Sequence, residues 1–212
     1  MKKEIILSPE ELYYLGSILQ AEYMDYAYIA AMSKQGKSEE LFANEAKASL
    51  VKAGILAEDF GGDLEVEEAT AELLKPIFFG KTETSVDVYI NGEDTDMDVY
   101  KFHFLDGTVT LVTESDGQFF IRKIESSQIN ELAESLISDD YKYFESANFP
   151  EINNEAVTRV IIAKSLKIGN VSTIRTFAEC NRIYYLALDN GGYKGLSKDL
   201  FLTEFLSIIK GE

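Results

Sequence analysis

One pattern of apolar and turn residues occurs twice in this chain of 212 residues. Residues 109–137 read VTLVTESDGQFFIRKIESSQINELAESLI, which predicts a strand, a tight turn, a second strand and a helix. Residues 183–209 read IYYLALDNGGYKGLSKDLFLTEFLSII, with the same order at nearly the same spacing. The turns contain Asp116-Gly117 and Asn190-Gly191, and such pairs favour hairpins because both central residues of the preferred turn need positive φ.

The two hairpin-plus-helix units indicate an α+β fold in which helices pack on an antiparallel sheet, with two pseudo-symmetric halves. Apolar residues make up 46% of the chain, enough to bury a core. We therefore expect one domain over residues 1–212, with pseudo-repeats at about 84–138 and 156–210. Residues 86–90 and 99–104 alternate between apolar and polar side chains, which predicts half-buried strands in the first repeat.

Helix-start signals open the chain. Ser8 is a predicted N-cap, Pro9 stands at the first helical position, and Glu11 completes a capping box, so a helix should run to about residue 19. Ser38 predicts the start of a second helix, and Gly54 stands where a left-handed C-terminal cap is expected.

The predicted secondary structure of two later segments depends on how proline and β-branched residues are interpreted. After the loop at residues 59–63, a third helix is expected over about 66–75, ended by Pro76. Residues 156–167 suit a strand by composition, yet their apolar residues also recur at helical spacing, and we favour the helix. A last helix is expected over residues 198–210, with these buried side chains: Leu200, Phe201, Phe205, Ile208 and Ile209.

The chain is strongly acidic, with 37 Asp and Glu against 20 Lys and Arg and a net charge of −17 at pH 7. This charge repels nucleic-acid phosphates and anionic lipids and favours a basic partner. The apolar run at residues 5–7 is too short for a signal-peptide core, and no stretch approaches the length of a membrane span. We expect a cytoplasmic protein without membrane insertion.

Residues able to carry catalysis or bind a cofactor are few. His103 is the one histidine, and Cys180 is the one cysteine. Asp94, Asp96 and Asp98 alternate as in a calcium loop, but Val99 and Leu105 stand where an EF-hand needs glycine and a bidentate glutamate. We expect no enzyme activity, no cofactor and no metal site.

Several segments together resemble the EspG-like chaperones of type VII (ESX) secretion. They are residues 45–56 (EAKASLVKAGIL), residues 61–65 (GGDLE), residues 71–76 (AELLKP) followed by strands, and the opening residues 6–12 (ILSPEEL). That family has a helix ending in a Gly-Leu element, a short loop, a helix closed by proline and then an antiparallel sheet, with a quasi-twofold relation between halves. The resemblance covers most of the chain.

The resemblance implies a cytosolic, non-catalytic chaperone that holds a helical secreted protein, of WXG or LXG type, until export. Contact with the export machinery is a further expectation. The family's connection between its second and third strands corresponds to residues 91–98 here. On this connection and the strand that follows we place the partner-binding residues Glu93, Asp94, Asp96, Asp98, Tyr100 and Phe102. The alternative is an acidic immunity protein that neutralises a basic toxin.

Overall fold

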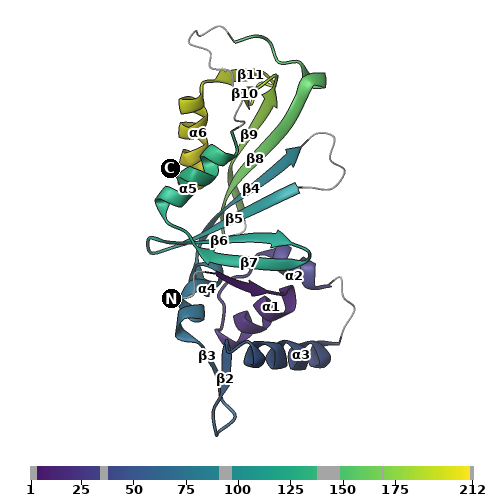
Figure 1. Cartoon of the computed structure of the whole chain (residues 1–212), viewed down its shortest axis with the longest axis vertical. Helices are drawn as coiled ribbons and strands as arrows, with labels where there is room; N and C mark the ends of the chain where they lie inside the picture. The colour runs from purple at the N-terminus through teal and green to yellow at the C-terminus, as the bar shows by residue number, and fades with distance from the viewer. Residues whose placement is uncertain (1–3, 34–37, 91–96, 138–148, 169, 211–212) are drawn as a thin grey trace. The chain divides into compact units, whose positions relative to one another are not determined.

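A computed structural model describes residues 4–33, 38–90, 97–137, 149–168 and 170–210 (Figure 1). The predicted α+β class is confirmed. The chain divides into two compact units that alternate along the sequence. The first unit comprises Met1–Thr82 and His103–Lys123, and the second comprises Glu83–Phe102 and Ile124–Glu212. Folding as a single domain stays a prediction.

The first unit combines helices with strands of the main sheet, in which the order is β1-β7-β6. Its helices are α1 (Pro9–Ile18), α2 (Tyr26–Ser33), α3 (Glu39–Lys52) and α4 (Glu68–Phe79). Its strands are β1 (Glu4–Leu7), β2 (Leu56–Glu58), β3 (Leu64–Val66), β6 (Thr108–Ser115) and β7 (Gln118–Lys123). The strands β2 and β3 form a separate two-stranded sheet.

The predicted caps of α1 and α3 are confirmed. The Ser8 Oγ accepts a hydrogen bond from the Glu11 N–H at 3.2 Å, and Glu11 Oε2 accepts from the Ser8 N–H at 2.8 Å. At the end of α3, Gly54 has φ +72°. The N–H of Ile55 donates to the Leu50 carbonyl at 3.0 Å, which satisfies a helix-end acceptor as in a Schellman motif.

The prediction that Pro76 ends a helix is wrong. Pro76 lies inside α4, which continues to Phe79. Proline removes one intrahelical donor and its ring crowds the preceding turn, which weakens the hydrogen bonds to carbonyls there. The Thr110 hydroxyl donates to the carbonyl of Leu73 at 2.8 Å, so a tertiary bond stabilises the interrupted turn.

Three short elements of the first unit are absent from our sequence interpretation: β1, α2 and the β2–β3 hairpin. The start of α2 has a local signal, since Asp25 Oδ1 accepts from the Ala27 N–H at 3.1 Å. Asp59 organises the β2–β3 turn by accepting from the Gly61 and Asp63 N–H groups at 2.8 and 2.9 Å.

The second unit contains the strand order β5-β4-β8-β9-β10-β11, together with the helices α5 (Ser126–Ser135) and α6 (Lys198–Lys210). Its strands are β4 (Thr82–Ile90), β5 (Met97–Leu105), β8 (Val157–Lys167), β9 (Asn170–Cys180), β10 (Ile183–Ala187) and β11 (Tyr193–Leu196). Thr82 and the end of β5 from His103 onward belong to the first unit. A 3-10 turn, Asn154–Ala156, precedes β8.

The helix favoured over residues 156–167 is wrong, because this segment is the strand β8. Its register with β9 runs from Val157 opposite Cys180 to Lys167 opposite Asn170, with irregularities after Val157 and Ser165. Valine and isoleucine fit a pleated surface better than a helix. The long pairing therefore overrides the apolar spacing.

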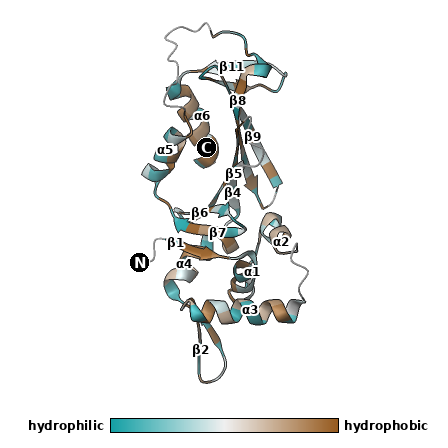
Figure 2. Ribbon diagram, turned by 45° about the vertical axis from the view of Figure 1, so that its right-hand side comes forward, coloured by the Kyte–Doolittle hydropathy of each residue, from teal (hydrophilic) through white to brown (hydrophobic). Residues whose placement is uncertain are grey.

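The helix α6 packs on β8 and β9, and α5 lies beside α6 (Figures 1 and 2). Phe201 is fully buried at the centre of an aromatic cluster, with ring centroids 5.0 Å from Phe177, 4.6 Å from Tyr184 and 5.6 Å from Phe205. Leu200 does not join this core as predicted, since its side chain is 44% exposed on the outer face of α6.

Both repeat segments contain four strands followed by a helix: β4 to β7 and then α5, and β8 to β11 and then α6. Their superposition stays a prediction. Asp116 and Gly117 both have positive φ, as the turn prediction requires. In the second hairpin only Gly191 does, and Asn190 instead accepts a hydrogen bond from the Gly192 N–H at 2.9 Å.

Candidate partner-binding surface

The predicted partner-binding residues that the structure describes differ in their exposure to solvent. Glu93, Asp94 and Asp96 lie outside the described residues. Asp98 is exposed and Tyr100 is half-buried. Phe102 is fully buried, so its assignment as a partner contact is corrected. The three described side chains lie at alternate positions of β5, on one side of the strand, and this side becomes buried towards Phe102.

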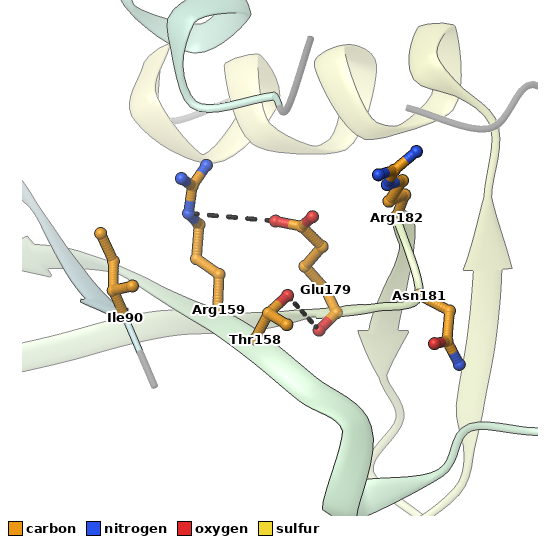
Figure 3. Close-up of a pocket in the computed structure, with 6 residues that line it drawn as sticks. All are labelled: Ile90, Thr158, Arg159, Glu179, Asn181 and Arg182. Atoms are coloured by element: carbon orange, nitrogen blue, oxygen red, sulfur yellow. Dashed lines mark hydrogen bonds and ion pairs between the residues drawn. The ribbon is translucent and has the colours of Figure 1, made fainter. Parts of the chain in front are cut away.

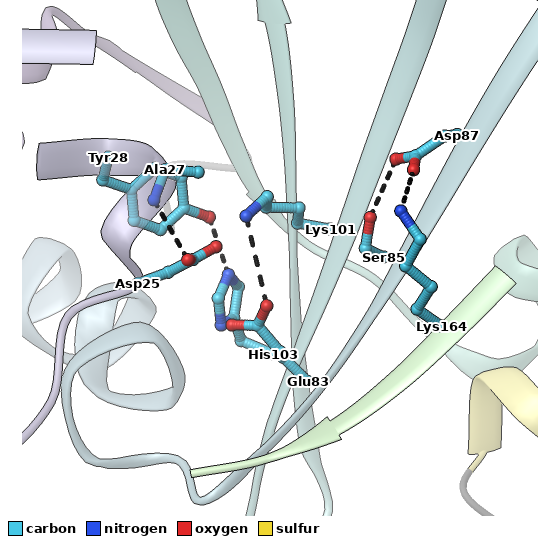
Figure 4. Close-up of polar contacts among 9 residues, drawn as sticks. All are labelled: Asp25, Ala27, Tyr28, Glu83, Ser85, Asp87, Lys101, His103 and Lys164. Carbon is cyan, nitrogen blue, oxygen red and sulfur yellow. Dashed lines mark hydrogen bonds and ion pairs between the residues drawn. The ribbon is translucent and has the colours of Figure 1, made fainter. Parts of the chain in front are cut away.

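The neighbouring strand β4 is buried on both sides rather than half-buried as predicted, with every residue from Glu83 to Val88 buried. The buried polar groups of Ser85 and Asp87 are satisfied internally. The Ser85 hydroxyl donates to Asp87 Oδ1 at 2.9 Å, and Lys164 Nζ donates to Asp87 Oδ2 at 2.8 Å (Figure 4). Only near its end does the strand expose an aromatic ring, that of Tyr89 at 42%.

A second buried carboxyl group, that of Glu83, lies near an ammonium group. Glu83 is 5% exposed, and Lys101 Nζ lies 4.0 Å from Glu83 Oε1 (Figure 4). Burial raises the pKa of Glu83 from 4.5 to about 7. The cost of removing the carboxylate from water therefore outweighs the attraction of the ammonium.

A pocket of about 390 Å³ opens at the end of β4. It is lined by Ile90, Thr158, Arg159, Glu179, Asn181 and Arg182 (Figure 3). Ile90 is the last described residue before the predicted acidic connection, while the other residues come from β8, β9 and the β9–β10 turn.

The carbonyl of Leu136, at the C-terminal cap of α5, organises one side of this pocket. It accepts hydrogen bonds from Arg159 Nη1 and the Tyr184 hydroxyl, both at 2.7 Å. Glu179 Oε2 lies 3.1 Å from the Tyr184 oxygen and 3.9 Å from Arg159 Nε. The guanidinium thus meets the negative end of the helix dipole, which stabilises both groups.

Tyr184 stays a hydrogen-bond donor in this network. Burial raises the pKa of the Tyr184 hydroxyl, and the Glu179 carboxylate raises it further. Sequence reasoning missed Arg159, Glu179 and Tyr184, because they come from three strands and form no motif. The sequence signal that could have indicated this network is the presence of charged residues, Arg159 and Glu179, within otherwise apolar strands.

The β9–β10 turn has an unusual backbone. Asn181 and Arg182 have φ +52° and +67°, and they lie between the paired residues Cys180 and Ile183. A two-residue hairpin loop with positive φ at both positions favours Asn-Gly. Asparagine tolerates this region, but an arginine there strains its Cβ against the backbone.

Arg182→Gly is therefore expected to stabilise the protein by about 1 kcal/mol, since glycine adopts positive φ without that strain. Urea unfolding of the variant and the wild type measures the difference. Asn181→Gly is the matched control and should change stability by a few tenths of a kcal/mol. A destabilised Arg182→Gly variant would contradict the strain argument.

The remaining candidate residues, His103 and Cys180, do not line the pocket. His103 Nε2 is 2.7 Å from the Tyr28 hydroxyl in a buried pair (Figure 4), and Cys180 is buried at the end of β9. Within the described ranges, no group of three His, Cys, Asp or Glu side chains could hold a metal ion. None of the helices described is long and apolar enough to cross a membrane.

No family model matches the chain. No curated protein matches its sequence. Among solved structures, the chain is similar to the type VII secretion system chaperone EspG5 of Mycobacterium tuberculosis, determined in complex with a PE25–PPE41 dimer. The TM-score is 0.62 at 9% sequence identity, and the match covers 98% of this chain and 96% of EspG5. The EspG-like fold expected from the sequence is confirmed.

Proposed function

We propose that this protein is a cytoplasmic, non-catalytic chaperone of a type VII (ESX-like) secretion system, and that it binds helical secreted proteins. The observation that carries the proposal is the likeness to EspG5 over nearly the full length of both chains. A match of this extent covers both units of the chain rather than one common motif.

The partner-binding surface in this proposal lies at the ends of β4 and β5. It comprises Asp98, Tyr100 and Tyr89, together with Glu93, Asp94 and Asp96 of the acidic connection. Half-exposed tyrosines provide apolar area with a polar tip, as is common at protein interfaces. A helical partner of WXG or LXG type would place apolar anchors on these rings, and the acidic groups would orient it.

Co-expression with the small helical proteins encoded nearby tests the proposal. The expected result is a stable complex of defined stoichiometry that survives size-exclusion chromatography. Failure of all these proteins to bind, together with tight binding of a neighbouring basic toxin, would replace the chaperone with the immunity protein.

Neutralising Glu93, Asp94, Asp96 and Asp98 to their amides is expected to slow association about tenfold at low salt and to flatten its salt dependence. Charges at the rim of an interface mainly steer the encounter, so dissociation should change little. Stopped-flow or surface plasmon resonance at several salt concentrations measures both rates.

The matched control removes four exposed acids from the first unit: Glu65→Gln, Asp106→Asn, Glu114→Gln and Asp116→Asn. This control changes the net charge by the same amount as the first variant. If the effect on association is local to the acidic connection, the control should associate as fast as the wild type. If both variants slow association to the same extent, only the overall charge matters and the acidic connection is not at the interface.

A further inference from the structure

We propose that the pocket formed by residues 149–152 and the strands β10 and β11 binds the guanidinium group of an arginine side chain from a partner protein. The pocket has a volume of about 340 Å³. The side chains that would contact the guanidinium are those of Phe149, Glu151 and Tyr193. This site uses other residues than the partner-binding surface proposed above, and it does not require the chaperone function.

Two tyrosines place aromatic rings on one face of the sheet at this pocket. Tyr185 of β10 pairs with Gly195 of β11, and Tyr193 lies two residues before Gly195, so all three positions share a face. Tyr184, the neighbour of Tyr185, contacts Phe201 of α6 with ring centroids 4.6 Å apart. Because side chains alternate along β10, the pocket lies on the face opposite α6.

The segment at residues 149–152 is fixed against this face. A Cβ at Gly195 would lie 2.1 Å from Phe149 Cγ, so the Phe149 ring packs directly on the backbone of β11. The Tyr185 hydroxyl donates to the Pro150 carbonyl at 3.1 Å. These contacts hold the wall of the pocket in place. A ligand therefore meets a preorganised site, which lowers the entropy cost of binding.

The chemistry of the lining favours a cation. Aromatic rings carry a negative electrostatic potential on their faces, which attracts guanidinium and ammonium groups. Tyr193 is 42% exposed, so part of its ring is open to a ligand. Among the described residues, the lining contains one carboxylate, that of Glu151, and no basic side chain. Lys194 follows Tyr193 in β11, and strand alternation places its side chain on the other face.

The carboxylate of Glu151 is available to pair with this cation. Glu151 is exposed, and its carboxylate makes no hydrogen bond or ion pair with the other described residues. A guanidinium is planar and forked, so it stacks on an aromatic ring and donates to a carboxylate at the same time. The compact ammonium of lysine has no flat face to stack. Arginine is therefore the side chain that fits this lining best.

Titration of the isotope-labelled full-length protein by NMR tests the proposal. The probe is the peptide acetyl-Ala-Ala-Arg-Ala-Ala-amide. The matched peptide has citrulline in place of arginine, which keeps the shape of the side chain and removes its charge. Methylguanidinium forms a third arm. We expect saturable shifts at the backbone amides of Glu151, Tyr193 and Gly195 with the arginine peptide, and none with the citrulline peptide.

Glu151→Gln should weaken binding of the arginine peptide about tenfold, which corresponds to the loss of one charge-assisted hydrogen bond. Tyr193→Leu should weaken it about fivefold, because the aromatic face is lost while an apolar side chain remains. Both residues are exposed, so both variants should remain folded. Glu155→Gln removes a nearby exposed acid that does not line the pocket, and it should leave binding unchanged.

Equal shifts with the arginine and citrulline peptides, or no shift with any probe, would overturn the site. Equal weakening by Glu151→Gln and Glu155→Gln would also overturn it, because only the overall charge would then matter. Unchanged binding by Tyr193→Leu would contradict the stacking of the guanidinium on the ring. Binding of methylguanidinium without binding of the arginine peptide would overturn the assignment to a partner protein and identify a small organic cation as the ligand.

Discussion

Glu83→Gln is expected to stabilise the folded protein by about 2 kcal/mol at pH 8. The carboxyl group of Glu83 is 5% exposed, and burial raises its pKa from 4.5 to about 7. A shift of this size corresponds to about 3 kcal/mol at a pH above both values. The nearby Lys101 ammonium loses its carboxylate in the variant, which offsets part of the gain.

The same pKa shift determines how stability depends on pH. Between pH 4.5 and 7, the folded state holds a proton on Glu83 that the unfolded state has released. Stability from this group therefore falls as the pH rises through that range, and the penalty is constant above it. The Gln side chain does not titrate, so the difference between variant and wild type should grow from pH 5 to pH 8.

Urea unfolding of both proteins at pH 5, 6, 7 and 8 measures this difference. Glu65→Gln is the control, because Glu65 is exposed and its replacement should change stability by less than about 0.5 kcal/mol at each pH. A Glu83→Gln effect that stays constant across the series would show that the carboxyl group titrates normally.

Local sequence signals predicted helix ends well where the interactions are themselves local. Ser8, Glu11, Ser38 and Gly54 each act within a few residues of their own position, and the structure confirms all four. Pro76 does not end its helix, because a tertiary hydrogen bond stabilises the turn that the proline interrupts. The hydrogen bond from Thr110 to Leu73 joins residues 37 positions apart, which no local pattern indicates.

The period of the apolar residues was ambiguous in residues 156–167, where strand and helix spacing overlap. Pairing with β9 along nearly the whole strand decided the outcome. Similarly, the hairpin β6–β7 belongs to the first unit, whereas α5, which follows it directly, belongs to the second. The sequence pattern joined them because they are adjacent in the chain, but packing assigns them to different cores.

The candidate site also combines parts that the sequence can indicate with parts that depend on long-range contacts. The acidic connection is contiguous in the sequence, so it could be proposed as a partner site from its acidic residues and from the family resemblance. The pocket unites residues of β4, β8, β9 and the β9–β10 turn, and its organising acceptor, the Leu136 carbonyl, lies 23 residues before Arg159. Backbone acceptors carry no sequence signal, so this network could be found only in the folded chain.

Gly80→Ala is expected to destabilise the protein by about 3 kcal/mol. Gly80 follows α4 with φ −69°, which any residue can adopt, so the requirement for glycine is purely one of space. A Cβ there would overlap the Pro76 carbonyl oxygen and lie 2.7 Å from the carbonyl oxygen of Phe104. Both are backbone atoms, so relief requires movement of α4 or of β5.

Gly61→Ala separates this clash from the general effect of replacing glycine. A Cβ at Gly61 would meet first a side-chain oxygen, Asp59 Oδ1 at 3.3 Å, which can move by a few tenths of an ångström. Both substitutions reduce the entropy of the unfolded chain equally, so the control should change stability by less than about 1 kcal/mol. Thermal and urea unfolding measure both variants. Equal stability of the two would mean that α4 and β5 separate without cost, which contradicts the close approach of their backbones at Gly80.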